Sequence, residues 1–378
     1  MNNFIFSRKN IHIDRGDGVY LYTPDGTAYL DLGASYACVP VGHNHPDVIS
    51  SIQNQLEKLS YVQGSFPVTI RDDFHEKLIE ISPGDIQNIW LCNSGTEANE
   101  AAIKFARHAT KRSQIISTKQ AFHGRTLGAL SATWKPTYKK GFGPLTPDFD
   151  FATFGDVESL VDTISEETAA VIVEPIQGEG GVNLPPPGYL QEVRKITEEV
   201  GAAMILDEIQ TGLGRTGSFW TCNQDNIVPD ILTSAKGLAN GLPIGATFCK
   251  DWIANDPGNH GGTFSGGPVI CAAGNATIDV IQRENLSNNA SKLGSYIIKE
   301  LEGAIGDQTR DIRGSGLLIG IQVKHGSGPI LNKLASNHGI LALPAGKTVV
   351  RLLPPLTIDK THAEDFISAI TQILEETS

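Results

Sequence analysis

Short apolar runs alternate with helical patterns through the middle of the chain. The runs NIWLCN, SQIIST, TAAVIVEP, AAMILDE and DILTSAK have the length of buried strands. Between them, EANEAAIKFARHATK and YLQEVRKITEEV repeat apolar residues with the period of a helix. Strands and helices that alternate in this way predict an α/β fold with a mostly parallel central sheet flanked by helices.

The two ends of the chain have a different pattern. After about residue 255, long helical stretches alternate with short strands such as LLIGIQVK and VVRLLPPL. The apolar face of a last helix is marked by Phe366, Ile370, Ile373 and Leu374. Near the start, YLYTPDGTAYLDL predicts a hairpin that turns at Pro24, Asp25 and Gly26. We therefore predict a large domain over residues 49–255 and a smaller α+β domain over residues 256–378, which segment 1–48 joins.

Composition and charge narrow the class of protein. The 378 residues are enough for about two or three domains. The formal net charge is −12 and no Lys/Arg-rich run occurs, which argues against nucleic acid or an anionic membrane surface as a partner. The apolar runs are too short to span a bilayer and the start MNNFIFSRKN lacks an export signal, so we expect a cytoplasmic protein. Five widely spaced cysteines without a CxxC pair predict reduced thiols.

One lysine, Lys236, stands in the otherwise uncharged stretch SAKGLANGLPIG. Most loop lysines are solvated, but these flanks offer no charged neighbour, and Gly237 allows close approach by another group. A lysine that loses solvation has a lowered pKa, and its amine can form a Schiff base. Asp207 ends the run AAMILD, and the carboxyl ends of strands are where α/β sheets bind ligands. Asp207 is therefore either a cap or turn residue, or a partner of Lys236 in one pocket.

A Schiff-base lysine paired with an acid suggests pyridoxal phosphate, whose ring nitrogen stays protonated beside a carboxylate. Its phosphate needs a separate anchor. In NIWLCNSGTEANEAA a strand leads through Ser94, Gly95 and Thr96 into a helix, whose positive end, N–H groups and hydroxyls attract an anion. A capping box of Ser94 and Glu97 explains the same residues, and the two interpretations are compatible.

The segment QAFHGRTLGAL offers a second group of candidates. Phe122 could stack on an aromatic ring, with His123 beside it, and Arg125 could bind a carboxylate with both arms. The alternative is a turn with a surface arginine.

Two further patterns favour structural roles. Gly212, Gly214 and Gly217 spell GxGxxG after a strand, but SFWTCNQDNIVPD follows without a helical period, so a dinucleotide site is disfavoured. His43 and His45 in GHNHP have no carboxylate or cysteine nearby, which favours a structural turn; we predict no metal site.

Seven motifs occur in the order of one known family: NSGTEANEAAIKFAR, FHGRTLGAL, VEPIQGEGGV, LDEIQTGLGRTG, SAKGLANGLPIGA, HGGTFSGGP and VVRLLPPL. Over nearly its whole length the sequence resembles the class III, fold-type-I pyridoxal-phosphate aminotransferases, most of all the acetylornithine and ornithine group. The resemblance implies the fold-type-I architecture and transfer of an amino group.

The resemblance also implies roles around the cofactor. Lys236 would bind the aldehyde of pyridoxal 5′-phosphate, and Asp207 would face the pyridine nitrogen. Gln210 would lie near the phenolic oxygen, and Phe122 would stack on the ring.

Gly95 and Thr96 would contact the phosphate, with Ser94 and His123 also close to the cofactor. Thr263 would reach the phosphate of a neighbouring subunit, which implies a homodimer. HGGTFSGGP departs from the family's common TYGGNP form at Ser265 and Gly267.

For substrates, the resemblance implies Arg351 for an α-carboxylate and Arg125 for a second carboxylate, as in 2-oxoglutarate. Glu179 would act as a switch that neutralises Arg351 while an ω-amine donor is bound. Tyr36 matches a tyrosine that meets the substrate in ornithine aminotransferases.

The expected donor is N-acetylornithine, or a lysine or ornithine carried by a small acidic LysW-type protein, as in similar archaeal enzymes of lysine and arginine biosynthesis. A carrier would need a basic rim, for which Lys135, Lys139 and Lys140 are candidates. Ornithine δ-aminotransferase and 4-aminobutyrate-type activity are the alternatives. An NAD-dependent oxidoreductase and a non-enzymatic small-molecule binding protein are remote ones.

Overall fold

The computed structural model describes residues 9–256 and 258–376. Its centre is a seven-stranded sheet in the order β4-β10-β9-β8-β7-β5-β6. The strands are β4 (Asn88–Cys92), β5 (Gln114–Thr118), β6 (Phe149–Ala152), β7 (Thr168–Val173), β8 (Ala203–Asp207), β9 (Ile231–Ser234) and β10 (Gly245–Cys249). Only β10 is antiparallel to its neighbours in this sheet, so the predicted, mostly parallel sheet is confirmed.

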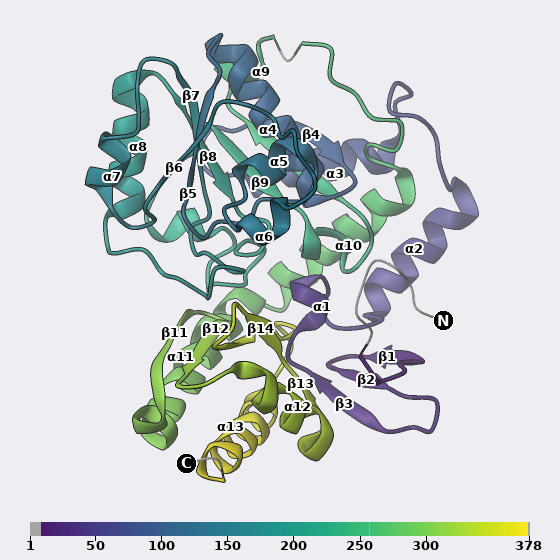
Figure 1. Cartoon of the computed structure of the whole chain (residues 1–378). Coiled ribbons are helices and arrows are strands. Elements are labelled where there is room, and N and C mark those ends of the chain that lie inside the picture. Colours follow the sequence, from purple (N-terminus) through teal and green to yellow (C-terminus); the bar gives the residue numbers. More distant parts are fainter. Residues whose placement is uncertain (1–8, 257, 377–378) are drawn as a thin grey trace.

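Alternate residues along the central strands are buried on opposite faces. On β7, Ala170 and Ile172 pack in the cluster that includes α4 (Gly95–Thr110), whereas Val171 and Val173 pack in the cluster that includes α8 (Tyr189–Val200). The sheet is therefore covered by helices on both faces, as Figure 1 shows. This explains why the central strands are apolar throughout and do not alternate with polar residues.

The remaining helices surround this core. They are α1 (Ala34–Ala37), α2 (Pro46–Lys58), α3 (Thr69–Glu80), α5 (Leu127–Ala132), α6 (Pro136–Lys139), α7 (Val157–Val161), α9 (Asp251–Ala254), α10 (Pro268–Arg283), α11 (Leu286–Ile305), α12 (Ser327–His338) and α13 (Lys360–Glu375). Short 3₁₀ helices span Thr221–Gln224, Lys236–Ala239 and Gly306–Gln308. None of the helices in the described ranges has the length and apolar character needed to cross a membrane.

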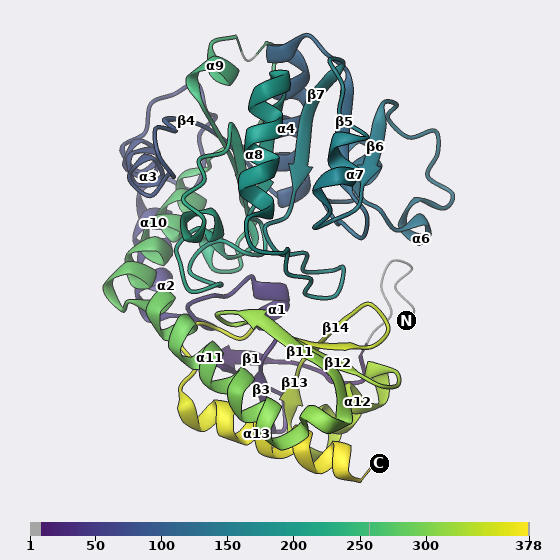
Figure 2. The ribbon, with the colours of Figure 1, turned by 90° about the vertical axis from the view of Figure 1, so that its left-hand side faces the viewer.

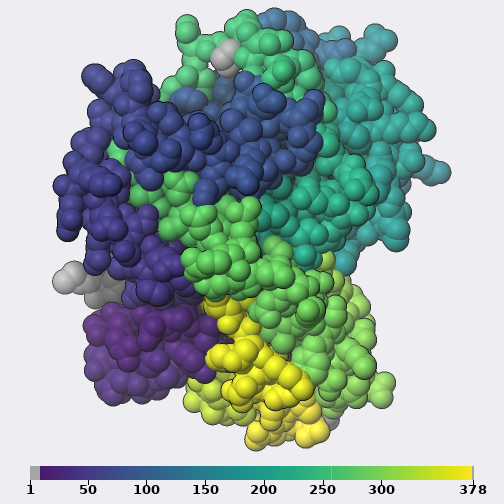
Figure 3. Space-filling view, turned by 180° about the vertical axis from the view of Figure 1, so that it is seen from behind, coloured from purple at the N-terminus to yellow at the C-terminus, as the bar shows by residue number. Residues whose placement is uncertain are grey.

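Segments from both ends of the chain share one small sheet. Its strands are β1 (Arg15–Asp17), β2 (Tyr20–Tyr22), β3 (Ala28–Asp31) and β13 (Ile340–Leu341). The predicted hairpin is confirmed by antiparallel pairing of β2 with β3, and β13 pairs parallel to β3. Figure 3 shows the purple segment near the start of the described chain beside the yellow C-terminal segment on the surface.

A second small sheet lies beside α11, α12 and α13, as Figure 2 shows. It contains β11 (Thr309–Ser315), β12 (Leu318–Val323), β14 (Leu343–Ala345) and β15 (Val349–Leu352). Helix α13 buries the predicted apolar face of the last helix, including Phe366 and Ile370. Strand β15 places Arg351 within hydrogen-bond distance of Glu179, which belongs to the large domain. This small sheet therefore contributes directly to the site described below.

Helix α11 packs closely against the turn between β11 and β12, where Gly294 meets Gly316. A Cβ added to Gly294 would overlap the carbonyl group of Gly316, whereas one added to Gly303 on the same helix would meet no atom. We predict that Gly294→Ala lowers the free energy of unfolding by about 1–3 kcal/mol through overpacking. Gly303→Ala should be neutral or stabilising, since alanine favours helices. Urea denaturation of both variants measures this; equal stabilities would contradict it.

Candidate active site

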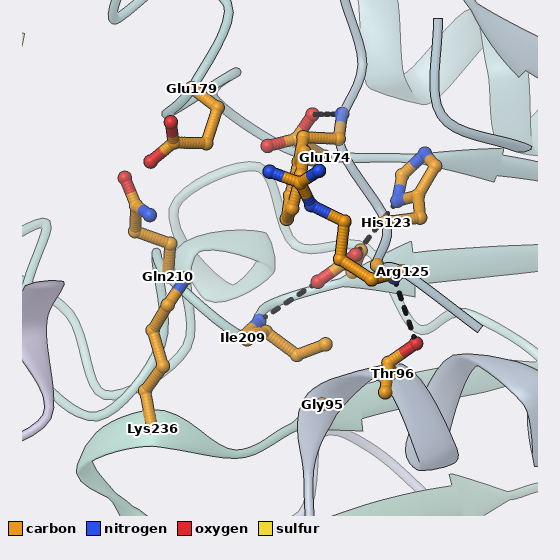
Figure 4. A pocket seen from close by; sticks show the side chains of 12 residues that line it. Gly95, Thr96, His123, Arg125, Glu174, Glu179, Ile209, Gln210 and Lys236 are labelled. Atoms are coloured by element: carbon orange, nitrogen blue, oxygen red, sulfur yellow. Dashed lines mark hydrogen bonds and ion pairs between the residues drawn. The ribbon is translucent and has the colours of Figure 1, made fainter. Parts of the chain in front are cut away.

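The loops that follow the central strands converge on one pocket. Asp207 ends β8, Lys236 follows β9 and Glu174 follows β7. The cavity has a volume of about 230 Å³ and is shown in Figure 4. It is lined by Gly95, Thr96, Phe122, His123, Gly124, Arg125, Glu174, Glu179, Asp207, Ile209, Gln210 and Lys236. The structure thus brings together nine of the residues proposed from the sequence: Gly95, Thr96, Phe122, His123, Arg125, Glu179, Asp207, Gln210 and Lys236.

Lys236 reaches this pocket from a strained backbone. Its φ of +40° lies in the left-handed region, which is costly for a side-chain-bearing residue. Gly237 packs so tightly that an added Cβ would lie 2.9 Å from the ring of Pro40. Burial lowers the pKa of Lys236, an effect that Glu179 and Asp207 partly oppose. The amine is therefore neutral, and so nucleophilic, at lower pH than an ordinary lysine.

Asp207 is fixed by a buried hydrogen-bond network. Its Oδ2 lies 2.7 Å from Nδ1 of His123 and accepts a hydrogen bond of 2.8 Å from the amide of Asn99. Its Oδ1 accepts a bond of 3.1 Å from the backbone N–H of Ile209. The amide oxygen of Asn99 in turn accepts a bond of 2.8 Å from Thr233. This network holds a carboxylate with fixed orientation at the inner end of the pocket.

The amino end of α4 forms another wall. The hydroxyl of Ser94 accepts from the N–H of Glu97, and the Glu97 carboxylate accepts from the N–H of Asn93, at 3.3 and 2.7 Å. Ser94 is therefore occupied as the helix cap and is not among the pocket-lining residues. Gly95 and Thr96 do line the pocket, at the positive end of a 16-residue helix, where an anion is favoured.

Arg351 is fully buried behind the pocket wall and is already paired. Its guanidinium donates to Oε1 of Glu179 at 2.6 Å and to Oε1 of Gln210 at 2.9 Å. A third bond of 3.2 Å goes to the carbonyl of Pro344. The Tyr36 ring lies 5.6 Å from this guanidinium, on the left-handed turn of α1. The charge of Arg351 is thus neutralised by a carboxylate that is itself part of the pocket.

Arg125 has a different environment. Its guanidinium lies 4.0 Å from the ring centre of Tyr138 and 5.4 Å from that of Phe122. Within the described part of the chain, this guanidinium makes no ion pair or hydrogen bond; only the backbone N–H of Arg125 is bonded, to Thr96. A cation free of carboxylate partners therefore faces the same pocket as Lys236.

Four further residues considered from the sequence lie outside the pocket: Thr263, Gly212, His43 and His45. Thr263 is exposed on a loop, and its carbonyl accepts from the hydroxyl of Tyr61. Gly212 packs under the ring of Trp220, and turns rather than a helix follow the GxGxxG glycines. His43 bonds Asp31 at 2.9 Å and His45 caps α2, in agreement with a structural turn.

Three residues that support the site were not predicted from the sequence: Glu174 lines the pocket, Asn99 bonds Asp207 and Tyr138 contacts Arg125. Asn99 lies inside a helical pattern, and Tyr138 lies in a surface segment selected for its lysines. Glu174 is buried and accepts bonds from the N–H groups of Phe122 and Gly178 at 3.1 and 3.2 Å. Its only sequence signal is its position directly after an apolar run, the same signal that selected Asp207.

The chain belongs to the class III aminotransferase family, which it matches over residues 6–374. It is 39% identical to a [LysW]-aminoadipate semialdehyde transaminase of Deinococcus radiodurans, over 98% of this chain and 87% of the relative. It is 40% identical to an acetylornithine aminotransferase of Methanosarcina mazei, over 97% and 92%. A solved ornithine aminotransferase of Toxoplasma gondii, described with partial occupancy of PLP at its active site, superposes with a TM-score of 0.94 at 31% identity, covering 99% of this chain and 93% of that one. The protein is therefore an aminotransferase of fold type I.

The carboxyl group of Glu174 generates a pH prediction. Burial raises its pKa to about 7, with His123 opposing and Asp207 adding to the shift. The folded protein holds this proton more tightly than the unfolded chain, so the carboxyl contributes most to stability below pH about 4.5 and loses that contribution as pH rises through 7.

We predict that Glu174→Gln gains stability relative to the parent between pH 5 and pH 8. The gain in the free energy of unfolding is at most about 3 kcal/mol, and the loss of one hydrogen bond reduces it. The measurement is the midpoint of thermal unfolding across this range, with exposed Glu166→Gln as the control. A difference that does not vary with pH would contradict the shift.

Proposed function

We propose that pyridoxal 5′-phosphate occupies this pocket and that Lys236 holds it covalently. The residues present fit the group: a buried amine with a lowered pKa at Lys236, a fixed carboxylate at Asp207 and a helix end at Gly95 and Thr96 are the three features the cofactor requires. When bound, the cofactor supplies an electron sink that stabilises negative charge on the substrate carbon.

Each side chain then has a task set by its place. Asp207, held by His123 and Asn99, would keep the ring nitrogen protonated. Phe122 would cover one face of the ring. Nζ of Lys236 would take the proton from the amine-bearing carbon of the donor and return one later, because its lowered pKa suits both directions.

The ion pair between Glu179 and Arg351, beside an unpaired Arg125, is the observation that carries the substrate proposal. With 2-oxoglutarate bound, both arginines would meet carboxylates, and Glu179 would turn away. With an ω-amine donor bound, the reacting end has no carboxylate, so Glu179 would keep Arg351 neutralised. One pocket would thereby serve a donor and an acceptor of different charge.

We propose N-acetylornithine, or lysine or ornithine linked to a carrier protein, as the donor; the semialdehyde and glutamate are the products. The two curated relatives named above bear such activities in their names. Ornithine and 4-aminobutyrate remain the alternatives, and the tyrosine at position 36 favours the former.

For an acidic carrier the basic rim is smaller than the sequence indicates. Lys139 donates to the carbonyl of Ser131 at 3.1 Å and lies 4.6 Å from the Phe151 ring, and burial lowers its pKa. Lys140 is exposed and Lys135 partly so. These two lysines are the better contacts for a carrier.

A homodimer completes the proposal. Phe66 and Phe264 are 61% and 63% exposed, and the Tyr61 ring lies 5.2 Å from that of Phe264. Exposed aromatic clusters are typical of association surfaces. Thr263 is next to Phe264 in the chain. We propose that a second copy binds at this surface, so that Thr263 of one copy reaches the phosphate site of the other.

We predict that Lys236 is the covalent attachment site. Borohydride reduction of the holoenzyme, followed by mass spectrometry of its peptides, should place the cofactor's mass on the peptide containing Lys236. Lys236→Ala should carry no label and show at least a thousandfold slower transfer. Exposed Lys299→Ala is the control and should keep the label and the parent's rate of transfer. A label on another side chain would overturn the assignment.

The donor and the switch are tested in one experiment. Single-turnover rates of the amino-donor half-reaction are compared for glutamate, N-acetylornithine, ornithine, 4-aminobutyrate, lysine and carrier-linked lysine. We expect N-acetylornithine or carrier-linked lysine to be the fastest ω-amine donor. A higher rate with free ornithine would select the alternative.

In the same experiment, Glu179→Ala should favour glutamate over the best ω-amine donor by at least tenfold. The physical reason is that this variant leaves Arg351 buried without a carboxylate partner when the ω-amine donor is bound, whereas glutamate supplies a carboxylate of its own. Exposed Glu166→Ala is the control and should leave the ratio unchanged. Identical half-reaction rates in Glu179→Ala and the parent would refute the switch.

A further inference from the structure

Each of the two arginines near the pocket lies close to a tyrosine ring. Arg351 lies 5.6 Å from the Tyr36 ring centre and Arg125 lies 4.0 Å from that of Tyr138. The difference lies in their other partners, because Arg351 also has Glu179 and two further hydrogen-bond acceptors. For Arg125, aromatic rings are the only side-chain partners of the guanidinium in the described ranges.

Tyr138 is well supported for such a role. Its ring packs edge-to-face on Phe122, with centres 5.5 Å apart and planes at 82°. It lies on α6, a short helix that Lys139 ties to the carbonyl of Ser131 at the end of α5. The ring is half-buried, whereas the arginine is exposed. A fixed aromatic surface therefore lies against a long and otherwise mobile cationic side chain.

Contact between the Arg125 guanidinium and the Tyr138 ring has a specific consequence for carboxylate binding. A guanidinium that contacts a ring through its flat face keeps its N–H groups available in its own plane, where a carboxylate can accept two bonds. An exposed arginine without such support loses side-chain entropy when it binds. A carboxylate partner in place of the ring would compete with the substrate, as Glu179 does at Arg351. An aromatic partner orients the cation without occupying its donors.

We infer that Tyr138 is a positioning residue that presents Arg125 to the second carboxylate of the dicarboxylate acceptor. This inference rests on the proposed function, in which Arg125 binds that carboxylate. Tyr138 contacts the arginine and not the reacting atoms, so its effect is on affinity for dicarboxylates.

The test uses the cofactor-loaded enzyme and glutarate, a dicarboxylate that cannot react. Tyr138→Leu and Tyr138→Gln should weaken glutarate binding, measured by calorimetry, about fivefold, the size of a cation–π contact. Tyr138→Phe retains the ring and should stay within twofold of the parent. The ratio of single-turnover rates for glutamate and norvaline, which lacks the second carboxylate, should fall by the same factor in the Leu variant.

A matched control exists in the N-terminal hairpin. Arg15 lies 3.6 Å from the ring centre of Tyr22, a pair of the same kind outside the pocket. Tyr22→Leu should leave glutarate affinity unchanged. Circular dichroism and retention of the cofactor establish that each variant is folded.

The double variant separates this inference from the proposed function. If Tyr138 acts through Arg125, then Arg125→Gln with Tyr138→Leu binds glutarate no more weakly than Arg125→Gln alone. Normal glutarate binding in both non-aromatic Tyr138 variants, with weak binding in Arg125→Gln, would overturn the inference and leave the proposed function standing. Normal glutarate binding in Arg125→Gln would overturn the inference about Tyr138 and also the role of Arg125 in the proposed function. Equal losses in Tyr138→Phe and Tyr138→Leu would assign the effect to the hydroxyl and also overturn the inference.

Discussion

The site depends on the desolvation of one ammonium group. Lys236 stands where β9 ends, with its backbone strained and its neighbours small and uncharged. In water an ordinary lysine is charged and unreactive toward an aldehyde. Burial penalises the charged form, and here that penalty outweighs the attraction of Glu179 and Asp207, since the net direction of the pKa shift is downward. The close fit of Gly237 against Pro40 and the left-handed backbone at Lys236 are what make this burial possible.

The same edge of the sheet also has to accommodate two buried carboxyl groups without repulsion between them. Asp207 has three donors, including an imidazole, whereas within the described residues Glu174 is bonded by two backbone N–H groups and by no cation. The group with more donors is the better stabilised anion. Burial raises the pKa of Glu174 and the charge of Asp207 adds to the shift, so protonation of Glu174 relieves the repulsion between the two groups.

Much of this arrangement could be predicted from the sequence, for identifiable reasons. Helix α8 matches the predicted YLQEVRKITEEV because its period is strong and Gly188 and Gly201 bound it. Lys236 and Asp207 stood out because each charge follows an apolar strand. Strand β10 was missed, since GATFC follows a glycine-rich loop and has no alternation to distinguish it. Its antiparallel pairing depends on contacts with β9, the preceding strand, and with β4, which is far away in the sequence.

Two of the residues that were missed, Asn99 and Tyr138, share one property: their role depends on a partner rather than on their own segment. Asn99 lies on the buried face of α4 and shows its function only through Asp207, 108 residues away. Tyr138 shows its function only through Arg125. No local pattern reports such a pairing, because helical periodicity and charge are the same with or without the partner.

Local pairing also explains how an acidic protein binds a dianion. A net charge of −12 repels dicarboxylates at long range, but that field is screened over about 8 Å in physiological salt. Around the proposed carboxylate sites the local charge comes from Arg125, Arg351 and Glu179, in surroundings where each charge counts for more. In the proposed mechanism, turning Glu179 aside would change the local charge by a full unit without any change in fold. Specificity for two substrates of different charge would then need one movable acid and two cations: Arg351, which is held in the protein core, and Arg125, which lies against an aromatic ring.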